Sequence, residues 1–386
     1  MTEKNIYMDN NATTRIDPVV KEAVLKGFDL SGNASSMHGP GRAASAAVNH
    51  ARIQTAKLLG ADPEEIIFTS GGSESNNTVL NLVYTQLFAK SGRKRIITTS
   101  IEHPSIIETV ESFKEKGVPV TIIGVDSYGK LDMEALRSEA GDDVALISVM
   151  MANNEIGTIQ DIAQAAEIAA SCGALMHTDA VQAAGKIALD VHALKVDFAS
   201  ISGHKLHGPK GIGALYIRKG LNIEPLIRGG HQEQGQRAGT YNTPGIIGLG
   251  AAAEIAFAEL AAETDYISKL RNRLHRGIET SIPNVHMNGH PDDVLPGTLN
   301  VSFPGAEGES ILLYLDMEGI SVSTGSACAT GSLEPSYVLI ATGVGPELAH
   351  GSIRFSLGKF NTEKEVDFVL EILPPVIKRL REMSTL

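Results

Sequence analysis

The chain has 386 residues, and its 45 aspartates and glutamates outnumber its 33 lysines and arginines, which gives a formal net charge of -12. No run of basic residues is long enough to follow a nucleic-acid backbone, so this balance argues against nucleic acid and suits a small metabolite. The start, MTEKNIYMDNN, lacks the apolar core of a signal peptide, and the most apolar segment, residues 245–260, is short for a membrane span and carries Glu254 and Glu259. We therefore expect a cytoplasmic protein without a membrane partner.

The first part of the chain alternates short apolar runs with amphipathic stretches between Glu65 and Gly213. The predicted strands cover residues 65–70, 95–100, 120–125, 144–150, 174–178, 196–201 and 212–217. Residues 159–171 carry apolar side chains at helical spacing, and Gly173 follows them as a predicted C-cap. Strands that alternate with helices in this way predict a mostly parallel sheet covered by helices.

The pattern changes in the second part of the chain. A long alanine-rich helix is predicted from about Ile246 to Ile278, and strands are predicted at 298–303 and 352–357. The last helix has a capping-box start, Thr362 with Glu365 three residues on, and Pro374-Pro375 is expected to kink it. We expect two domains joined by the long helix. They are a large α/β domain over residues 13–255 and a smaller α+β domain over residues 1–12 and 256–386.

Polar clusters follow the predicted strands of the large domain. They are SGGSESNN (70–77), IEHPS (101–105), ANNEIG (152–157), TDAVQ (178–182) and SGHK (202–205). One such cluster is usually turn chemistry. Five of them at strand ends predict an active site at one edge of the sheet, where α/β proteins bind ligands.

These clusters contain the groups that pyridoxal phosphate requires. Gly72 and Ser73 stand at the start of a predicted helix whose N–H groups can hold a phosphate, and Ser202 and His204 can complete that site. Asp179 needs a positive partner if it is buried, and a protonated ring nitrogen is one. The cofactor also needs a lysine for its Schiff base. Lys205, on a glycine-rich turn beside other cations, has a setting that favours loss of its proton.

Several other motifs have an ordinary interpretation beside a functional one. GPGRAA (39–44) resembles a dinucleotide fingerprint, but no strand clearly precedes it. His204 and His207 have a spacing that could suit a metal, yet no third ligand is evident, and two cysteines cannot form a four-thiolate site. Cys172, near the end of an alanine-rich helix, is interpreted as a small buried hydrophobe. Cys328 lies in a Gly-, Ser- and Thr-rich run, where thiolate chemistry is plausible.

The chain resembles the cysteine desulfurases of the NifS/IscS type, which are fold-type I pyridoxal phosphate enzymes of the class-V aminotransferase family. Nine strings carry the resemblance in the family's order: YMDNNATT, SESNN, EHPS, NNEIG, TDAVQ, SGHKLHGPKG, RAGTYN, STGSAC and SIRFSLGKFNT. Two departures are visible. The chain has SGGSESNN where the family often has SGATESNN, and GNASS where it often has GNPSS. Ser73 keeps a hydroxyl at the first of these positions, and Ala34 loosens a loop at the second.

The resemblance implies a role for each matching residue. Lys205 is the Schiff-base lysine, His103 stacks on the cofactor ring and serves as acid or base, and Cys328 is the catalytic cysteine. The implied cofactor-binding residues are Gly72, Ser73, His103, Asn154, Asp179, Gln182, Ser202, His204 and Lys205, with Thr240 reaching the phosphate of the neighbouring subunit. Asn154 and Arg354 bind the substrate, and the planar guanidinium of Arg354 suits a carboxylate.

The resemblance also implies the reaction and the partners. A homodimer removes sulfur from L-cysteine, leaves L-alanine and a persulfide on Cys328, and passes the sulfur to an iron-sulfur scaffold or another acceptor. No intrinsic metal is implied, although Cys328 could transiently ligate an iron-sulfur cluster with such a scaffold. Alternatives on the same cofactor are selenocysteine lyase and transaminase activity, since fold does not fix the chemistry. An inactive scaffold that binds acceptor proteins is the alternative from another class.

Overall fold

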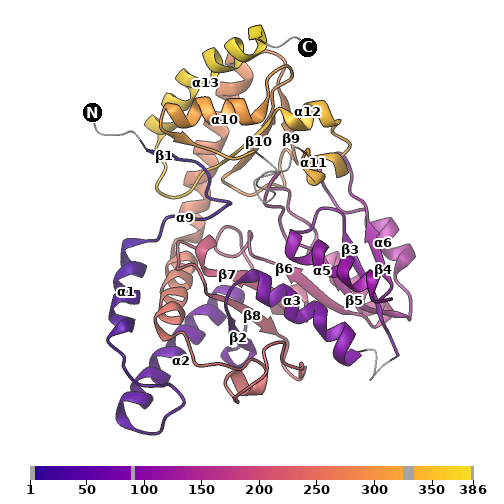
Figure 1. The fold of residues 1–386 in the computed structure, drawn as a ribbon, viewed down its shortest axis with the longest axis vertical. Coiled ribbons are helices and arrows are strands. Elements are labelled where there is room, and N and C mark those ends of the chain that lie inside the picture. Colours follow the sequence, from indigo (N-terminus) through magenta and orange to yellow (C-terminus); the bar gives the residue numbers. More distant parts are fainter. Residues whose placement is uncertain (1–4, 88–91, 325–333, 384–386) are drawn as a thin grey trace.

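A computed structural model describes residues 5–87, 92–324 and 334–383. The chain forms a large lower part built on a wide sheet and a smaller upper part, with one long helix running between them (Figure 1). The elements of the small part come from both ends of the chain. Its first strand, β1 (Ile6–Tyr7), pairs in parallel with β11 (Ile320–Ser321).

The large sheet has seven strands in the order β2-β8-β7-β6-β5-β3-β4. They are β2 (Ile66–Thr69), β3 (Arg95–Thr99), β4 (Val120–Ile123), β5 (Val144–Ser148), β6 (Leu175–Asp179), β7 (Phe198–Ser202) and β8 (Gly213–Ile217). The five strands from β7 to β4 are parallel, and β8 runs antiparallel to both β7 and β2. Each of the seven predicted strands is present, with its bounds shifted by a few residues at most. The predicted mostly parallel sheet is confirmed.

Helices cover this sheet, as the alternating sequence pattern predicted. They are α1 (Pro18–Phe28), α2 (Gly39–Leu59), α3 (Gly72–Leu82), α5 (Pro104–Glu115), α6 (Met133–Glu139), α7 (Ile162–Cys172) and α8 (Val191–Leu194). Helix α7 ends at Gly173, which has φ 74° and caps it as predicted. Helix α2 begins at Gly39 after a loop, so no strand leads into GPGRAA and the dinucleotide interpretation fails.

The small part combines a three-stranded antiparallel sheet with helices. The sheet order is β12-β10-β9, and the strands are β9 (His286–Asn288), β10 (Thr298–Ser302) and β12 (Ser352–Ser356). The helices are α10 (Gly308–Met317), α11 (Tyr337–Ala341), α12 (Pro346–His350) and α13 (Glu363–Met383). The predicted capping box of α13 is present: the Thr362 N–H donates to Glu365 Oε2 at 2.8 Å, and the Glu365 N–H donates to Thr362 Oγ1 at 3.3 Å. The helix runs on through Pro374 and Pro375.

The long helix α9 (Thr243–Ser281) belongs to two hydrophobic cores. Its first half packs Ile246 and Leu249 into the core of the large sheet, and its second half packs Leu270 and Leu274 into the core of the small part. The expected boundary at residues 255 and 256 falls on this helix. Helix α9 is long and apolar enough to cross a membrane by length and composition, but 44% of its most apolar window is buried inside the protein.

Candidate active site

One pocket collects ten of the twelve predicted site residues. It lies at the ends of the parallel strands, between the large sheet and the small part, and the predicted residues in its wall are Gly72, Ser73, His103, Asn154, Asp179, Gln182, Ser202, His204, Lys205 and Arg354. Asn11, Ala12, Asn76, Ser105, Met150 and Val181 complete the wall. The strand-end clusters therefore converge as parallel topology requires.

Asp179, the last residue of β6, is a buried carboxylate at the floor of the pocket. Its side chain is only 5% exposed. The Asn76 side-chain amide donates to Asp179 Oδ2 at 2.7 Å, and the Val181 N–H donates to Oδ1 at 2.9 Å. Both donors are neutral, and the part of the chain that the structure describes shows no ion pair with this carboxylate. A cation that enters the pocket would give the Asp179 carboxylate the opposite charge that it lacks there.

His103 is the N-cap of α5 and is held as a neutral ring. Its Nδ1 accepts a hydrogen bond from the Ser105 N–H at 3.1 Å, so the proton of the neutral imidazole lies on Nε2. Burial lowers the pKa of His103, the nearby Asp179 carboxylate opposes this, and the Lys205 ammonium adds to it. The lowered pKa favours the neutral ring, whose Nδ1 can accept a proton and whose Nε2–H can donate one.

The first turn of α3 and the end of β7 form the anion-binding end of the pocket. The helix begins at Gly72, and its first N–H groups have no partner within the helix. A Cβ built at Gly72 would lie 2.6 Å from Cγ2 of Val181, so only glycine lets the backbone lie this close. Ser202 is buried at the end of β7, and His204 follows in the same pocket. Burial, then the cations Lys205 and Lys210, lower the pKa of His204 to about 4.

Lys205 lies just past the end of β7 and reaches the N-terminal segment of the chain. Its Nζ donates to the backbone carbonyl of Asn11 at 2.5 Å and to that of Ala12 at 2.7 Å. The same segment is tied to the lysine turn by its backbone, since the Thr14 N–H donates to the His204 carbonyl at 2.9 Å. The lysine is thus held in the pocket by a wall that comes from the first residues of the sequence.

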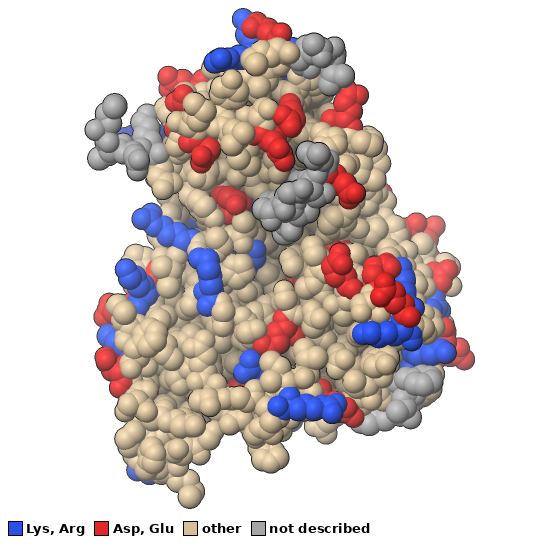
Figure 2. Space-filling view, in the orientation of Figure 1, with Lys and Arg blue, Asp and Glu red and all other residues tan. Residues whose placement is uncertain are grey.

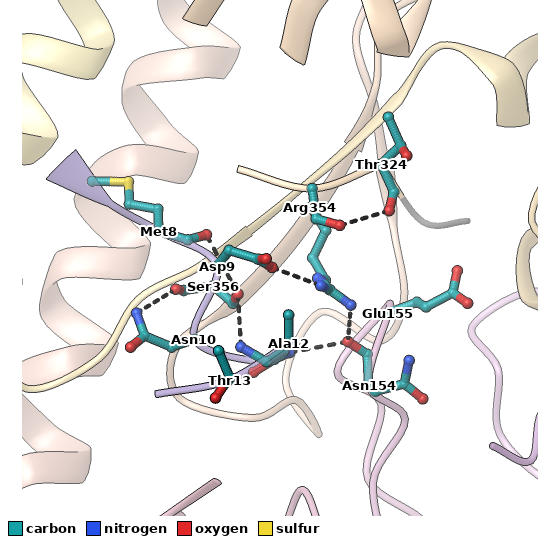
Figure 3. A network of polar contacts seen from close by, with 12 residues as sticks. Met8, Asp9, Asn10, Ala12, Thr13, Asn154, Glu155, Thr324, Arg354 and Ser356 are labelled. Atoms are coloured by element: carbon teal, nitrogen blue, oxygen red, sulfur yellow. Dashed lines mark hydrogen bonds and ion pairs between the residues drawn. The ribbon is translucent and has the colours of Figure 1, made fainter. Parts of the chain in front are cut away.

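Arg354, in the middle of β12, is buried and faces the pocket from the small part. It is 3% exposed, its Nη2 donates to Asp9 Oδ1 at 2.7 Å, and its Nη1 donates to the Asn154 carbonyl at 3.0 Å. Figure 3 shows the guanidinium between these two residues. Its Nε is buried and has no hydrogen-bond partner among the described residues, and the same holds for Oδ1 of Asn154. The two groups leave unmet hydrogen-bonding capacity beside the pocket.

Two predicted site residues lie elsewhere. Thr240 is exposed and lines a different pocket with Arg237 and Tyr241, so within one chain it does not reach the first pocket. Cys328 lies outside the described residues. For the possible His204–His207 metal pair, the described residues supply no third ligand, and Nδ1 of His207 lies 2.8 Å from the Arg15 carbonyl.

The sequence argument missed the residues that hold this pocket together. Asn11 uses its backbone carbonyl for Lys205 and Gln182, and its side-chain amide donates to the Asn154 carbonyl at 3.1 Å. Lys186, four residues after Gln182, donates to Gln182 Oε1 at 2.7 Å. The strings YMDNNATT and TDAVQ contain or adjoin these residues. Only the fold, however, brings residues 11 and 186 together.

The buried carboxyl of Glu102, next to His103, should make folding stability depend on pH. Burial raises its pKa to about 8, its hydrogen bonds with Met150 and Thr99 oppose this, and the nearby Asp179 charge adds to it. The folded chain then holds this proton up to about pH 8, while the unfolded chain releases it near the ordinary glutamate pKa of 4.5, so stability falls as pH rises between these values. Glu102→Gln should flatten this fall in urea unfolding midpoints measured from pH 5 to 8. An unchanged slope would contradict this assignment.

The comparisons with known proteins agree with this geometry. The family described as aminotransferase class-V matches residues 6–369. A cysteine desulfurase of Gluconacetobacter diazotrophicus is 48% identical over 382 residues, which cover 98% of this chain and 95% of that protein. The cysteine desulfurase IscS of Methanosarcina thermophila is 49% identical over 385 residues, covering 99% and 94%.

A solved structure gives the same result for the fold. A NifS-like protein superposes with a TM-score of 0.89 at 41% identity, and the match covers 98% of this chain and 99% of that one. The resemblance inferred from the nine sequence strings is therefore confirmed over nearly the whole length, and so is the predicted fold type. The chain belongs to the class-V aminotransferase family of pyridoxal phosphate enzymes.

Proposed function

We propose that this chain is a pyridoxal phosphate-dependent cysteine desulfurase that converts L-cysteine to L-alanine and leaves a persulfide on Cys328. The observation that carries the proposal is the single pocket in which Lys205, Asp179, His103 and Arg354 meet. Relatives with the name cysteine desulfurase match at almost full length, which supports the same reaction class. We also propose that the enzyme works in the cytoplasm.

The residues of the pocket fit the cofactor. Asp179 is a buried carboxylate that lacks an ion-pair partner in the described part of the chain, and the ring nitrogen of the cofactor is a cation when protonated. The N–H groups at the start of α3, with Ser73, Ser202 and His204, suit the phosphate. Gln182 and Asn154 line the space between these two ends. Lys205 supplies the amine.

Each residue then has a defined task. When bound, the cofactor supplies an aldehyde that combines with amines and a ring that draws electrons from the bonds of the substrate α carbon. Asp179, oriented by Asn76 and Val181, would pair with the ring nitrogen of the bound cofactor and favour its protonated form. Lys205 removes the α proton, and the neutral ring of His103 accepts or returns a proton beside it. Arg354 binds the substrate carboxylate.

The sulfur step belongs to Cys328. Its thiolate attacks the sulfur of the substrate, a sulfur–sulfur bond forms, and the carbon–sulfur bond breaks with its electron pair left on carbon. Protonation of that carbon gives alanine. The persulfide would then pass to an iron-sulfur scaffold or another sulfur-acceptor protein.

The direct test is to give L-cysteine to the purified protein loaded with pyridoxal phosphate. Alanine and protein-bound persulfide should appear in equal amounts during the first turnover, because each broken carbon–sulfur bond yields one of each. Alanine without persulfide would favour a lyase. Pyruvate in place of alanine, or no product from a protein with bound cofactor, would contradict the proposal.

Replacing Arg354 with lysine should raise the KM for L-cysteine by about 10- to 100-fold, because a lysine keeps the charge but loses the two-pronged hydrogen bonding to a carboxylate. The cofactor should bind as before, since Arg354 serves the substrate end of the pocket. Steady-state kinetics and cofactor absorbance measure the two effects. Arg273→Lys, on the exposed face of α9, is the matched control. Equal KM values for the two variants would remove the carboxylate role.

We propose further that the enzyme is a homodimer. The end of α1 and the loop before α2 leave large apolar side chains in water: Phe28 is 69% exposed and Met37 is 90% exposed. This lower left part of the molecule bears few charged side chains (Figure 2). Exposed apolar patches of this kind are typical of subunit interfaces. In a dimer, Thr240 of one copy would contact the cofactor phosphate in the pocket of the other copy.

Mixed dimers test the shared site. A Lys205→Ala chain paired with a Thr240→Ala chain has one site with both changes and one site with neither. If Thr240 serves the neighbouring subunit, a mixture that has exchanged subunits should exceed the average activity of the two parent proteins. The alanine assay measures this, and analytical ultracentrifugation checks the dimer. Activity equal to the parents' average would place Thr240 in its own subunit's site or in none.

A further inference from the structure

Lys186 is a lysine for which the proposed mechanism has no task, although it lies beside the pocket. It belongs to the turn after β6, and its ammonium group donates to Gln182 Oε1 at 2.7 Å and to Asn11 Oδ1 at 3.2 Å. We propose that Lys186 is a positioning residue that sets the orientation of these two side-chain amides and thereby of both ends of the active site. This inference rests on the proposed function, since it concerns the same pocket.

The ammonium group of Lys186 restricts how its two partners can orient. Lysine can donate hydrogen bonds but cannot accept them while charged. Each amide must therefore turn its oxygen toward Lys186 and its NH2 group away from it. The backbone carbonyls on the far side of each amide accept from its NH2 group and favour the same flip. Lys186 thus supplies the second, oxygen-side contact of both amides.

Both NH2 groups donate to backbone carbonyls that also accept from Lys205 or Arg354. Gln182 Nε2 donates to the Asn11 carbonyl at 2.9 Å, and this is the carbonyl that also accepts from Lys205. Asn11 Nδ2 donates to the Asn154 carbonyl at 3.1 Å. This carbonyl also accepts from Arg354 at 3.0 Å (Figure 3). Lys186 therefore acts on the lysine end of the pocket through Gln182 and on the arginine end through Asn11.

The surroundings of Lys186 favour loss of its charge. Burial, followed by the positive charges of Lys205 and Arg354, lowers the pKa of Lys186 to about 7, while the Glu263 carboxylate opposes this. A neutral amine still has two N–H groups, which is enough to donate to two amide oxygens. When Lys186 is neutral its lone pair can also accept, and the carbonyls of Asn11 and Asn154 then keep the two NH2 groups in place.

Lys186→Met tests the proposal, because methionine has a similar length and no donor. We expect it to raise the dissociation constant of pyridoxal phosphate from the apoprotein and the KM for L-cysteine, each by about 3- to 10-fold, the effect of losing one such hydrogen bond. The control is Lys359→Met. Lys359 lines the same neighbouring cavity as Lys186 but pairs with Asp17 at 2.7 Å, so both constants should stay at the parent value.

A double-mutant cycle separates positioning from a loss of structure. In a Gln182→Ala background, Lys186→Met should change the cofactor dissociation constant by less than twofold, because the amide through which it acts is gone. In an Asn11→Ala background, the change in KM should shrink in the same way. Thermal unfolding of the apoproteins checks that each variant folds.

Two results would overturn the proposal. One is a Lys186→Met protein with parent values for both constants. The other is an effect of the same size in the parent and in the Gln182→Ala and Asn11→Ala backgrounds, which would mean that Lys186 acts by a general effect on structure. A parent protein that binds the cofactor but does not convert L-cysteine would instead refute the proposed function. The cofactor arm of the cycle would still decide the role of Lys186.

Discussion

Lys205→Ala should reduce alanine formation from L-cysteine by roughly 10²- to 10⁴-fold or more, the range for loss of a positioned proton-transfer group. The loss follows because Lys205 is the amine that is held in the pocket, between the carbonyls of Asn11 and Ala12. The variant should also lose the cofactor more readily on desalting, since a covalent attachment point is gone. Visible absorbance of the desalted protein and the alanine assay measure the two effects.

Lys210→Ala is the matched control for this change. Lys210 lies on the same glycine-rich turn but is exposed and does not line the pocket, so activity and cofactor content should stay near the parent values. Borohydride reduction of the loaded parent protein followed by peptide mapping should place the cofactor on Lys205. A label on Lys210, or a Lys205→Ala protein that turns over at the parent rate, would show that the amine was assigned to the wrong residue.

Cys328→Ala should stop turnover and leave cofactor binding intact. The cysteine is assigned only to the sulfur step, and the phosphate, ring and amine contacts all come from other residues. Adding L-cysteine should still change the visible spectrum, because binding precedes the step that the thiolate performs. The measurements are the spectral change on mixing and the rate of alanine and persulfide formation.

Cys172→Ala serves as the control for the sulfur step. Cys172 is the last residue of α7, its thiol lies 3.3 Å from the Ala169 carbonyl, and it packs partly buried against the core of the large sheet. Its replacement should be almost silent in the assay. If Cys328→Ala released alanine and persulfide at the parent rate, the cysteine of STGSAC would have no part in the reaction, and direct elimination through the cofactor would be the better mechanism.

Much of the fold was open to prediction because its signals are local. The strand β5 reads as the buried run VALIS, and α7 ends where Gly173 adopts the left-handed conformation that glycine favours. The topology could be inferred only as mostly parallel. The antiparallel placement of β8 between β7 and β2 depends on how the turn after Lys205 directs the chain, and no periodic pattern records that direction.

Some residues of the site could likewise be predicted from the sequence, and others could not. Asp179 and Lys205 could be predicted because each lies at or just past the end of a parallel strand, so their positions depend on one rule of topology. Asn11, Lys186 and Asp9 could not, because their contacts cross between segments far apart in the sequence. The Asp9–Arg354 ion pair joins residues 345 positions apart. Asparagine and lysine are also common on surfaces, so their residue types gave no signal.

The wall around Lys205 sets the order in which the pocket can form during synthesis. The segment of Asn10 and Asn11 is synthesised long before its partner, because the Asn10 side chain donates to the Ser356 carbonyl, 346 positions later. At translation speeds of 5–20 residues per second this interval is roughly 20–70 s. The large sheet can assemble in that time, while β1 has no partner until β11 is made. A nascent chain therefore cannot build the complete pocket, and full cofactor binding belongs to the period after β12 has been synthesised.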